Sequence, residues 1–278
     1  MSGQLAETTI ITAFYPIAGK YQPWIKNLCK IPMHLIIFTT EVDAYKLYQW
    51  RREFLEITQI IVRPFYSFAM SCPSMMNIWN KQLALDTLSR TKTPEEYALW
   101  AMKQELVRIV IHTNRFQSKW FIWCDGGILR YSALQSYYMD FPSEVERLCI
   151  PGRMTFLEVN TIPDSYILDS QEKKEMVYPL PYTMVGGGCI VGDAEAWQEF
   201  GEAYKEMLKE FLLRGWFAGR DSDLYFAILF EKKARPFRLF HATKFGEECK
   251  VIEGIEWLSF PPILGGTIDA VLDTRFEE

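Results

Sequence analysis

One aromatic-rich apolar run in this chain ends abruptly in a carboxylate followed by two glycines. The run Trp120–Cys124 is followed directly by Asp125, Gly126 and Gly127. A short continuous apolar run is typical of a strand that is buried on both faces of a sheet. In open α/β sheets, ligands bind at the carboxyl ends of the strands. The sequence therefore places Asp125 where it could hold a cation or a sugar hydroxyl, and the glycines let a ligand approach the backbone.

Other short apolar runs alternate with helical segments along the 278 residues. Strands are predicted at residues 9–14, 34–39, 59–62, 120–124, 154–159 and 237–240. Helices are predicted at residues 41–54, 74–89, 94–112, 194–213 and 221–230, the fourth capped by Asp193. Residues 163–181 are expected to form a loop near the site. The alternation predicts an α/β fold with a Rossmann-type, mainly parallel central sheet flanked by helices, in a single domain.

The composition excludes several classes of protein. A net charge of −5 argues against a general nucleic-acid binder, which usually carries a basic face. The six cysteines form no C-x-x-C pair, which favours reduced thiols over a disulfide framework or a zinc site. No secretory signal is visible, and no apolar run approaches the roughly 20 residues that span a bilayer. We therefore expect a cytoplasmic protein with no transmembrane segment, although peripheral membrane contact stays open, as does the oligomeric state.

Two further segments carry groups that could bind a ligand. The run Gly186-Gly187-Gly188 could let backbone amides approach a sugar or a phosphate. It matches neither a dinucleotide fingerprint nor a P-loop, and it could equally be a strand bend or a close contact between two backbones. Asp221 and Asp223 open a predicted helix. One of them could cap that helix, and the other could act as a base or hold an acceptor hydroxyl.

Three basic or imidazole side chains complete the candidates. His241 ends a predicted strand, and neutral imidazole is a common metal ligand. Lys244 follows three positions later and could neutralise phosphate charge. Lys103 lies on the helix before the acidic strand and could reach the same cleft. The ordinary alternatives are a structural histidine and solvated surface lysines.

Taken together, these segments resemble the HtrL/YibB family, bacterial proteins linked to lipopolysaccharide-core loci and regarded as glycosyltransferases. The resemblance rests on the order of a few short motifs. They are Tyr97-Ala98-Leu99-Trp100 with Lys103, then Phe116-Gln117-Ser118, then residues 121–130 ending in Arg130, then Gly187-Gly188 and Asp221. Residues 9–14 match the opening strand of the family.

The resemblance implies a GT-A-like glycosyltransferase that moves a sugar from a nucleotide-diphosphate donor to a hydroxyl of a glycan or glycolipid, in polysaccharide, lipopolysaccharide or glycan synthesis. It divides the domain into a nucleotide-binding half near residues 1–130 and an acceptor and catalytic half near 131–278. It also implies a role for each candidate residue. The donor would be bound by Thr12, Ala13, Phe14, Lys103, Asp125, Gly126, Gly127, Arg130, Gly187, Gly188 and Lys244. Asp221 or Asp223 would orient or deprotonate the acceptor.

The resemblance also implies Mn²⁺ or Mg²⁺, held by Asp125 and His241 against the leaving diphosphate. The sequence departs from the usual pair of carboxylates, because position 127 is glycine. That departure favours a second interpretation, a catalytically inactive nucleotide- or carbohydrate-binding protein on the same fold. A third, a hydrolase using Asp221 and Asp223 as a carboxylate pair, ranks last, because helix residues two positions apart point in different directions.

Overall fold

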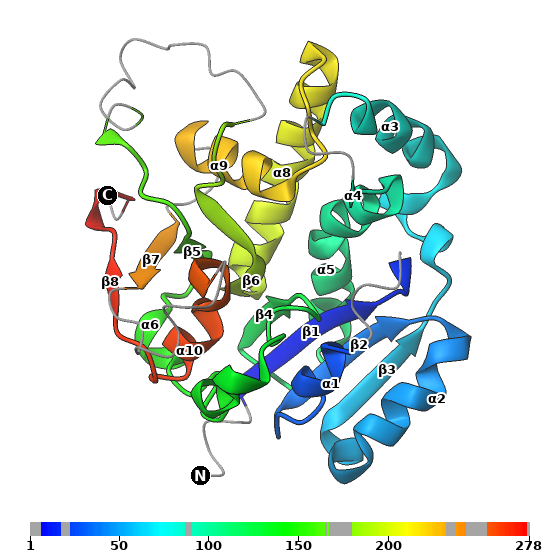
Figure 1. Ribbon diagram of the computed structural model, residues 1–278, viewed down its shortest axis with the longest axis vertical. Coiled ribbons are helices and arrows are strands. Elements are labelled where there is room, and N and C mark those ends of the chain that lie inside the picture. Colours follow the sequence, from blue (N-terminus) through cyan, green and yellow to red (C-terminus); the bar gives the residue numbers. More distant parts are fainter. Residues whose placement is uncertain are drawn as a thin grey trace.

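One eight-stranded sheet organises the molecule (Figure 1), in the order β3-β2-β1-β4-β6-β5-β7-β8. The computed structural model describes residues 7–17, 23–86, 91–164, 166, 180–231, 237–242 and 255–276. The strands are β1 (Thr8–Phe14), β2 (His34–Thr39), β3 (Thr58–Val62), β4 (Trp120–Cys124), β5 (Thr155–Glu158), β6 (Val185–Asp193), β7 (Arg238–Ala242) and β8 (Ala270–Leu272).

Most strands run in the same direction. β1 pairs parallel with β2 and β4, β2 pairs parallel with β3, and β5 pairs parallel with β7. β6 is antiparallel to both β4 and β5, and β8 is antiparallel to β7. This confirms the expected α/β fold with a mainly parallel, Rossmann-type sheet. Both predicted halves of the chain contribute strands to this sheet, and the functional division between the halves stays a prediction.

Helices cover both faces of the sheet (Figure 1). One core cluster contains residues from α3 (Pro73–Leu83), α4 (Pro94–Ala101), α5 (Lys103–Thr113), α8 (Ala194–Arg214) and α9 (Asp221–Glu231). The second contains residues from α1 (Ile25–Leu28), α2 (Glu41–Trp50), α6 (Val145–Leu148) and α10 (Phe260–Leu264). Short 3₁₀ helices are η3 (Arg52–Ile57), η4 (Phe65–Ser67), η5 (Ala69–Ser71), η7 (Ser132–Tyr138), η10 (Ile255–Leu258) and η11 (Thr274–Phe276). In the described part of the chain, no helix has the length and apolar character needed to cross a bilayer.

The side chains of β4 alternate between the two cores. Phe121 and Trp123 belong to the first cluster, whereas Trp120, Ile122 and Cys124 belong to the second. Both faces of β4 are therefore covered by core side chains. This agrees with the continuous apolar run in its sequence, from which a buried strand was predicted. By the same alternation, position 125 faces the first cluster, on the side of α5 and α9.

One predicted helix is divided into two in the structure, and the division sets the position of Lys103. The sequence predicts a single helix over residues 94–112, but α4 ends at Ala101 and α5 begins at Lys103. Met102 lies between them with φ −90° and ψ −3°, and its side chain is fully buried. The prediction of one helix was therefore wrong. The break makes Lys103 the first residue of a separate helix that packs beside β4.

The remaining boundaries differ from prediction mainly at helix ends. The helix predicted to reach residue 54 ends at Trp50 and continues as 3₁₀ helix η3, and the one predicted to reach residue 89 ends at Leu83. The predicted cap of α8 is confirmed, because Asp193 Oδ1 accepts a hydrogen bond from the Ala196 amide at 2.8 Å. Most of the predicted loop at residues 163–181 lies outside the described residues.

Candidate functional site

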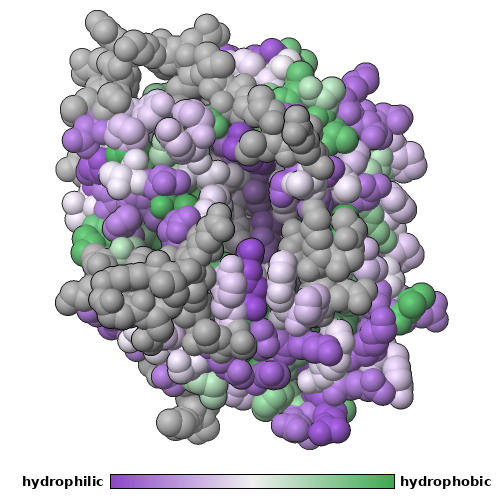
Figure 2. All heavy atoms as spheres, viewed as in Figure 1, coloured by the Kyte–Doolittle hydropathy of each residue, from purple (hydrophilic) through white to green (hydrophobic). Residues whose placement is uncertain are grey.

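A cavity of about 390 Å³ opens at the carboxyl end of β4. Figure 2 shows this face hollowed near its centre, with hydrophilic residues in the recess. Segments far apart in the sequence form its walls. They contribute Lys92, Trp100, Lys103, Asp125, Gly127, Ile128, Arg130, Thr183, Gly187, Gly188, Arg220, Asp221, Ser222, Trp257 and Leu258. Many of the residues singled out from the sequence therefore meet in one place.

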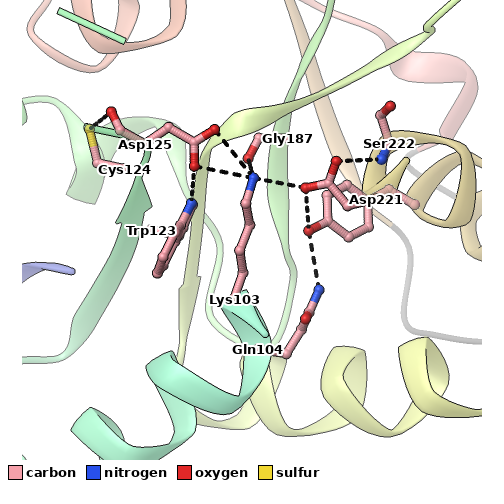
Figure 3. Close-up of polar contacts among 9 residues, drawn as sticks. Lys103, Gln104, Trp123, Cys124, Asp125, Gly187, Asp221 and Ser222 are labelled. Carbon is pink, nitrogen blue, oxygen red and sulfur yellow. Dashed lines mark hydrogen bonds and ion pairs between the residues drawn. The ribbon is translucent and has the colours of Figure 1, made fainter. Parts of the chain in front are cut away.

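The Lys103 ammonium lies at the centre of the polar contacts in this cavity (Figure 3). Its Nζ is 2.8 Å from Asp221 Oδ2 and 3.2 Å from Asp125 Oδ1, and it donates to the Gly187 carbonyl at 2.7 Å. Only 2% of the side chain is exposed. Burial acts to lower the pKa of Lys103, but the Asp125 and Asp221 carboxylates outweigh it and raise that pKa above its ordinary value. Lys103 is therefore charged, and it is not the solvated surface lysine that the sequence left open.

Asp125 is anchored by its backbone and by a neighbouring indole. Its amide donates to the Gly188 carbonyl at 2.7 Å, which continues the pairing of β4 with β6. Trp123 Nε1 donates to Asp125 Oδ1 at 2.6 Å. Burial raises the pKa of the Asp125 carboxyl, Lys103 opposes this, and the net direction is upward. Since 34% of the side chain is exposed, this carboxylate is open to a ligand in the cavity.

Asp221 is held more tightly than Asp125. Its Oδ1 accepts from the amide of the next residue, Ser222, at 2.8 Å, within the first turn of α9. Its Oδ2 accepts from the Tyr225 hydroxyl at 3.2 Å as well as pairing with Lys103. Gln104 Nε2 in turn donates to the Tyr225 hydroxyl at 3.1 Å. Both oxygens of this carboxylate are therefore occupied by groups of the protein.

Gly187 explains why the glycine run passes through this site. A Cβ atom at Gly187 would lie 2.8 Å from Asp221 Oδ2. At Gly188, the Cβ would lie 3.1 Å from Ile128 Cδ1 and 3.6 Å from Asp125 Oδ2. The missing side chains let α9 and the tip of β4 approach β6 closely. Both glycines also line the cavity, so close packing and an opening for a ligand coexist here.

The cavity has an excess of positive charge. Its lining contains four basic residues, Lys92, Lys103, Arg130 and Arg220, and two acidic ones. Arg130 Nε donates to the Gly127 carbonyl at 2.9 Å, and the guanidinium lies 5.1 Å from the centroid of the Trp24 ring. Lys92 Nζ lies 4.9 Å from the Trp100 ring centroid. Such a lining favours an anionic ligand.

Asp223 is separate from the cavity. Its side chain is 1% exposed, and its Oδ2 lies 3.3 Å from Arg220 Nε. Neither carboxylate oxygen has a hydrogen-bond partner among the described residues. Burial raises the pKa of Asp223 to about 7, which Arg220 opposes and Asp221 and Asp86 reinforce. The divergence of Asp221 and Asp223 expected from helix geometry is therefore observed, and in this arrangement Asp223 does not face a ligand in the cavity.

The other predicted site residues lie outside the cavity lining. Thr12, Ala13 and Phe14 end β1, the neighbour of β4; Thr12 is fully buried and Phe14 packs edge-on against Trp50. Gly126 is half-buried, and an added Cβ would touch Ile25 Cδ1 at 3.0 Å. Lys244 falls outside the described residues.

The residues expected to hold a divalent metal do not fit one as they are placed. His241 is exposed on β7, three strands from β4 in the sheet, which is about 14 Å at the usual strand spacing. Asp125 is already bonded to Trp123 and Lys103. Within the described ranges, no group of three or more His, Cys, Asp or Glu side chains could hold a metal ion. Asp125 and His241 therefore do not share one metal ion in this arrangement.

The sequence interpretation missed several residues of the site. Tyr225 lies four positions after Asp221 on α9, and Trp123 lies two before Asp125 on β4, so each shares a face with its partner. These spacings could have identified both. Arg220 and Lys92 precede predicted helices and carried no comparable signal. Gln104 bonds Tyr225, which lies 121 residues further along the chain, so no local spacing indicates this contact.

Comparisons with known proteins gave a likeness among solved structures and no match to a family model. No protein-family model matches it, and no curated protein matches it. Among solved structures, it is similar to mouse xyloside xylosyltransferase 1 in its apo form, with a TM-score of 0.45 and 10% identity. The match covers 81% of this chain and 82% of that one. A likeness at this level assigns no activity, so the strand order defines the fold and the cavity defines the site.

Proposed function

We propose that this chain is a GT-A-type glycosyltransferase that moves a sugar from a nucleotide diphosphate to a hydroxyl acceptor. One observation supports this above the others. Lys103, Asp125, Gly187 and Asp221 come from four separate elements and meet in one positively charged cavity at the carboxyl end of β4. In the sheet, β2 and β3 lie on one side of β1, whereas β4 and the later strands lie on the other side. Open α/β sheets bind ligands at such a switch point in strand order, which here lies between β1 and β4.

The charge and size of the cavity fit the diphosphate of such a donor. A volume of about 390 Å³ falls within the usual range of ligand pockets, roughly 300–1,000 Å³. Guanidinium groups bind phosphate oxygens in pairs, so we assign the diphosphate to Arg130 and Arg220, with Lys92 beside them. The acceptor in this proposal is a glycan or glycolipid, and membership of the HtrL/YibB family remains part of the proposal.

The two carboxylates would act on hydroxyl groups. In the transfer, the bond from the anomeric carbon to the diphosphate breaks and its electron pair leaves with the diphosphate oxygen. The acceptor oxygen bonds to that carbon, and its proton passes to a carboxylate. Asp125 suits this role better than Asp221, because it is the more exposed of the two. Burial also raises the pKa of Asp125 above its ordinary value, which improves a general base.

The proposal is tested by titrating the protein with uridine, guanosine, cytidine and adenosine diphosphates, using calorimetry and thermal unfolding. A ligand at about 100 times its dissociation constant stabilises the folded state by about 2.7 kcal/mol. At least one nucleotide should raise the melting temperature, and Arg130→Ala should weaken that response. Absence of any response to all four nucleotides would contradict the proposal.

A second candidate, a non-catalytic nucleotide- or carbohydrate-binding protein, is favoured by one observation. Both oxygens of Asp221 are occupied by Lys103, Tyr225 and Ser222. If Asp125 does not act as a base, the cavity binds its ligand without catalysing a reaction. Release of nucleoside diphosphate from a bound nucleotide sugar, abolished by Asp125→Asn with binding retained, decides for the enzyme. Binding without release under any acceptor decides for the second candidate.

A further inference from the structure

We propose that the Lys103 ammonium occupies the position a divalent cation would take between Asp125 and Asp221, so that this site binds a nucleotide diphosphate without a metal ion. The nucleotide part of this inference rests on the proposed function. The cation part rests only on the contacts of Lys103, and each part has its own test.

The contacts of Lys103 account for all of its donors. An ammonium has three N–H groups. Its Nζ lies 2.8 Å from Asp221 Oδ2, 2.7 Å from the Gly187 carbonyl, and 3.2 and 3.3 Å from the two oxygens of Asp125 (Figure 3). Two carboxylates and a carbonyl oxygen also form a ligand set that a hard divalent cation prefers. The lysine therefore fills a position that would otherwise attract such a cation.

A metal could use these carboxylates only by displacing Lys103. The side chain is 2% exposed and enters the site from the first residue of α5. Displacement would leave a buried ammonium without its counterions and next to a divalent charge, and both consequences are unfavourable. Because the ammonium is fully engaged, the diphosphate must be held by other groups. Lys92, Arg130 and Arg220 line the same cavity and carry the charge for this.

The unmodified protein provides the first test. Nucleoside diphosphate binding is measured by calorimetry in EDTA and again in Mn²⁺, and the two dissociation constants should agree within about twofold. A dissociation constant about tenfold weaker in EDTA would overturn the inference. Absence of nucleotide binding in both buffers would instead remove the proposed function.

The second test needs no nucleotide. Mn²⁺ is titrated into the protein alone and free Mn²⁺ is followed by electron paramagnetic resonance. The unmodified protein should not bind Mn²⁺ below about 1 mM, whereas Lys103→Ala should bind it at least about tenfold more tightly, and Lys103→Ala/Asp125→Asn should lose that gain. Tight Mn²⁺ binding by the unmodified protein, or no gain in a folded Lys103→Ala, would overturn the inference.

A matched control separates this effect from the loss of any paired lysine. Lys46 on α2 pairs with a single carboxylate, Asp43, at 3.3 Å, and about half of its side chain is exposed. Lys46→Ala should bind no more Mn²⁺ than the unmodified protein. If Lys103→Ala does not fold, the titrations of the unmodified protein still decide the question.

Discussion

Asp221 and Asp223 lie two positions apart at the start of α9, and both are buried, yet their surroundings differ. Asp221 belongs to a network with Lys103, Tyr225 and its own helix amide. Asp223 faces Arg220, and its oxygens accept no hydrogen bond from the described residues. Burial of charge is costly unless pairing and hydrogen bonds replace the lost water. The comparison shows one carboxylate, Asp221, whose charge is balanced by Lys103, and another, Asp223, whose pKa is raised to about 7 by burial.

The largest expected effect comes from removing the cation of the Asp221 network. Lys103→Met leaves two carboxylates, one of them only 10% exposed, without their counterion. Breaking a buried pair costs about 3–5 kcal/mol, so the free energy of unfolding in metal-free buffer should fall by about that amount. Urea denaturation measures it. Lys103→Met/Asp221→Asn should recover part of the loss, and equal stability of the two variants would show that Asp221 does not depend on Lys103.

The Asp223 side of the comparison predicts a pH dependence of stability. The pKa of Asp223 is raised from 3.8 to about 7 on folding. Between these values, the folded state holds a proton that the unfolded state has released. Stability therefore falls as the pH rises from about 4 to about 7, by up to about 4 kcal/mol, and then levels off. Asp223→Asn should remove this slope in urea titrations at several pH values, and an unchanged slope would assign it to another group.

A smaller loss is expected where β6 approaches Asp221. Gly187→Ala places a Cβ atom 2.8 Å from Asp221 Oδ2, and overpacking of this kind costs about 1–3 kcal/mol. Gly201→Ala on α8 is the matched control, because its Cβ would meet nothing closer than Gln104 Cβ at 3.8 Å. That change should stabilise the helix by about 0.5–1 kcal/mol. The two variants are compared by thermal unfolding. Equal effects on stability would show that the Asp221 side chain moves away from the added methyl group at little cost.

The smallest effect concerns a single hydroxyl. Tyr225→Phe removes the hydrogen bond to Asp221 and leaves Gln104 Nε2 without that partner, which should cost about 0.5–1.5 kcal/mol. The buried Tyr204 hydroxyl has no hydrogen-bond partner among the described residues. Tyr204→Phe should therefore be neutral or stabilising. A loss as large in Tyr204→Phe as in Tyr225→Phe would show that ring packing, and not the Asp221 network, sets both values.

Local patterns in the sequence were enough to predict much of the fold. The strands β1 to β4, the cap at Asp193 and the start of α9 all follow from side chains that are close neighbours in the chain. The break at Met102 could not be predicted in this way. Residues 94–112 have good helical periodicity, and only packing against the sheet favours two helices over one.

The sequence by itself determined that an acidic residue would end a buried strand and that Asp221 and Asp223 would face different surroundings. Both conclusions follow from strand and helix periodicity. Only the tertiary structure decided that Lys103 lies between Asp125 and Asp221, and that Gly187, 84 residues further along the chain, supplies its third acceptor. Contacts over such separations depend on how the whole sheet orders its strands. No local pattern encodes them.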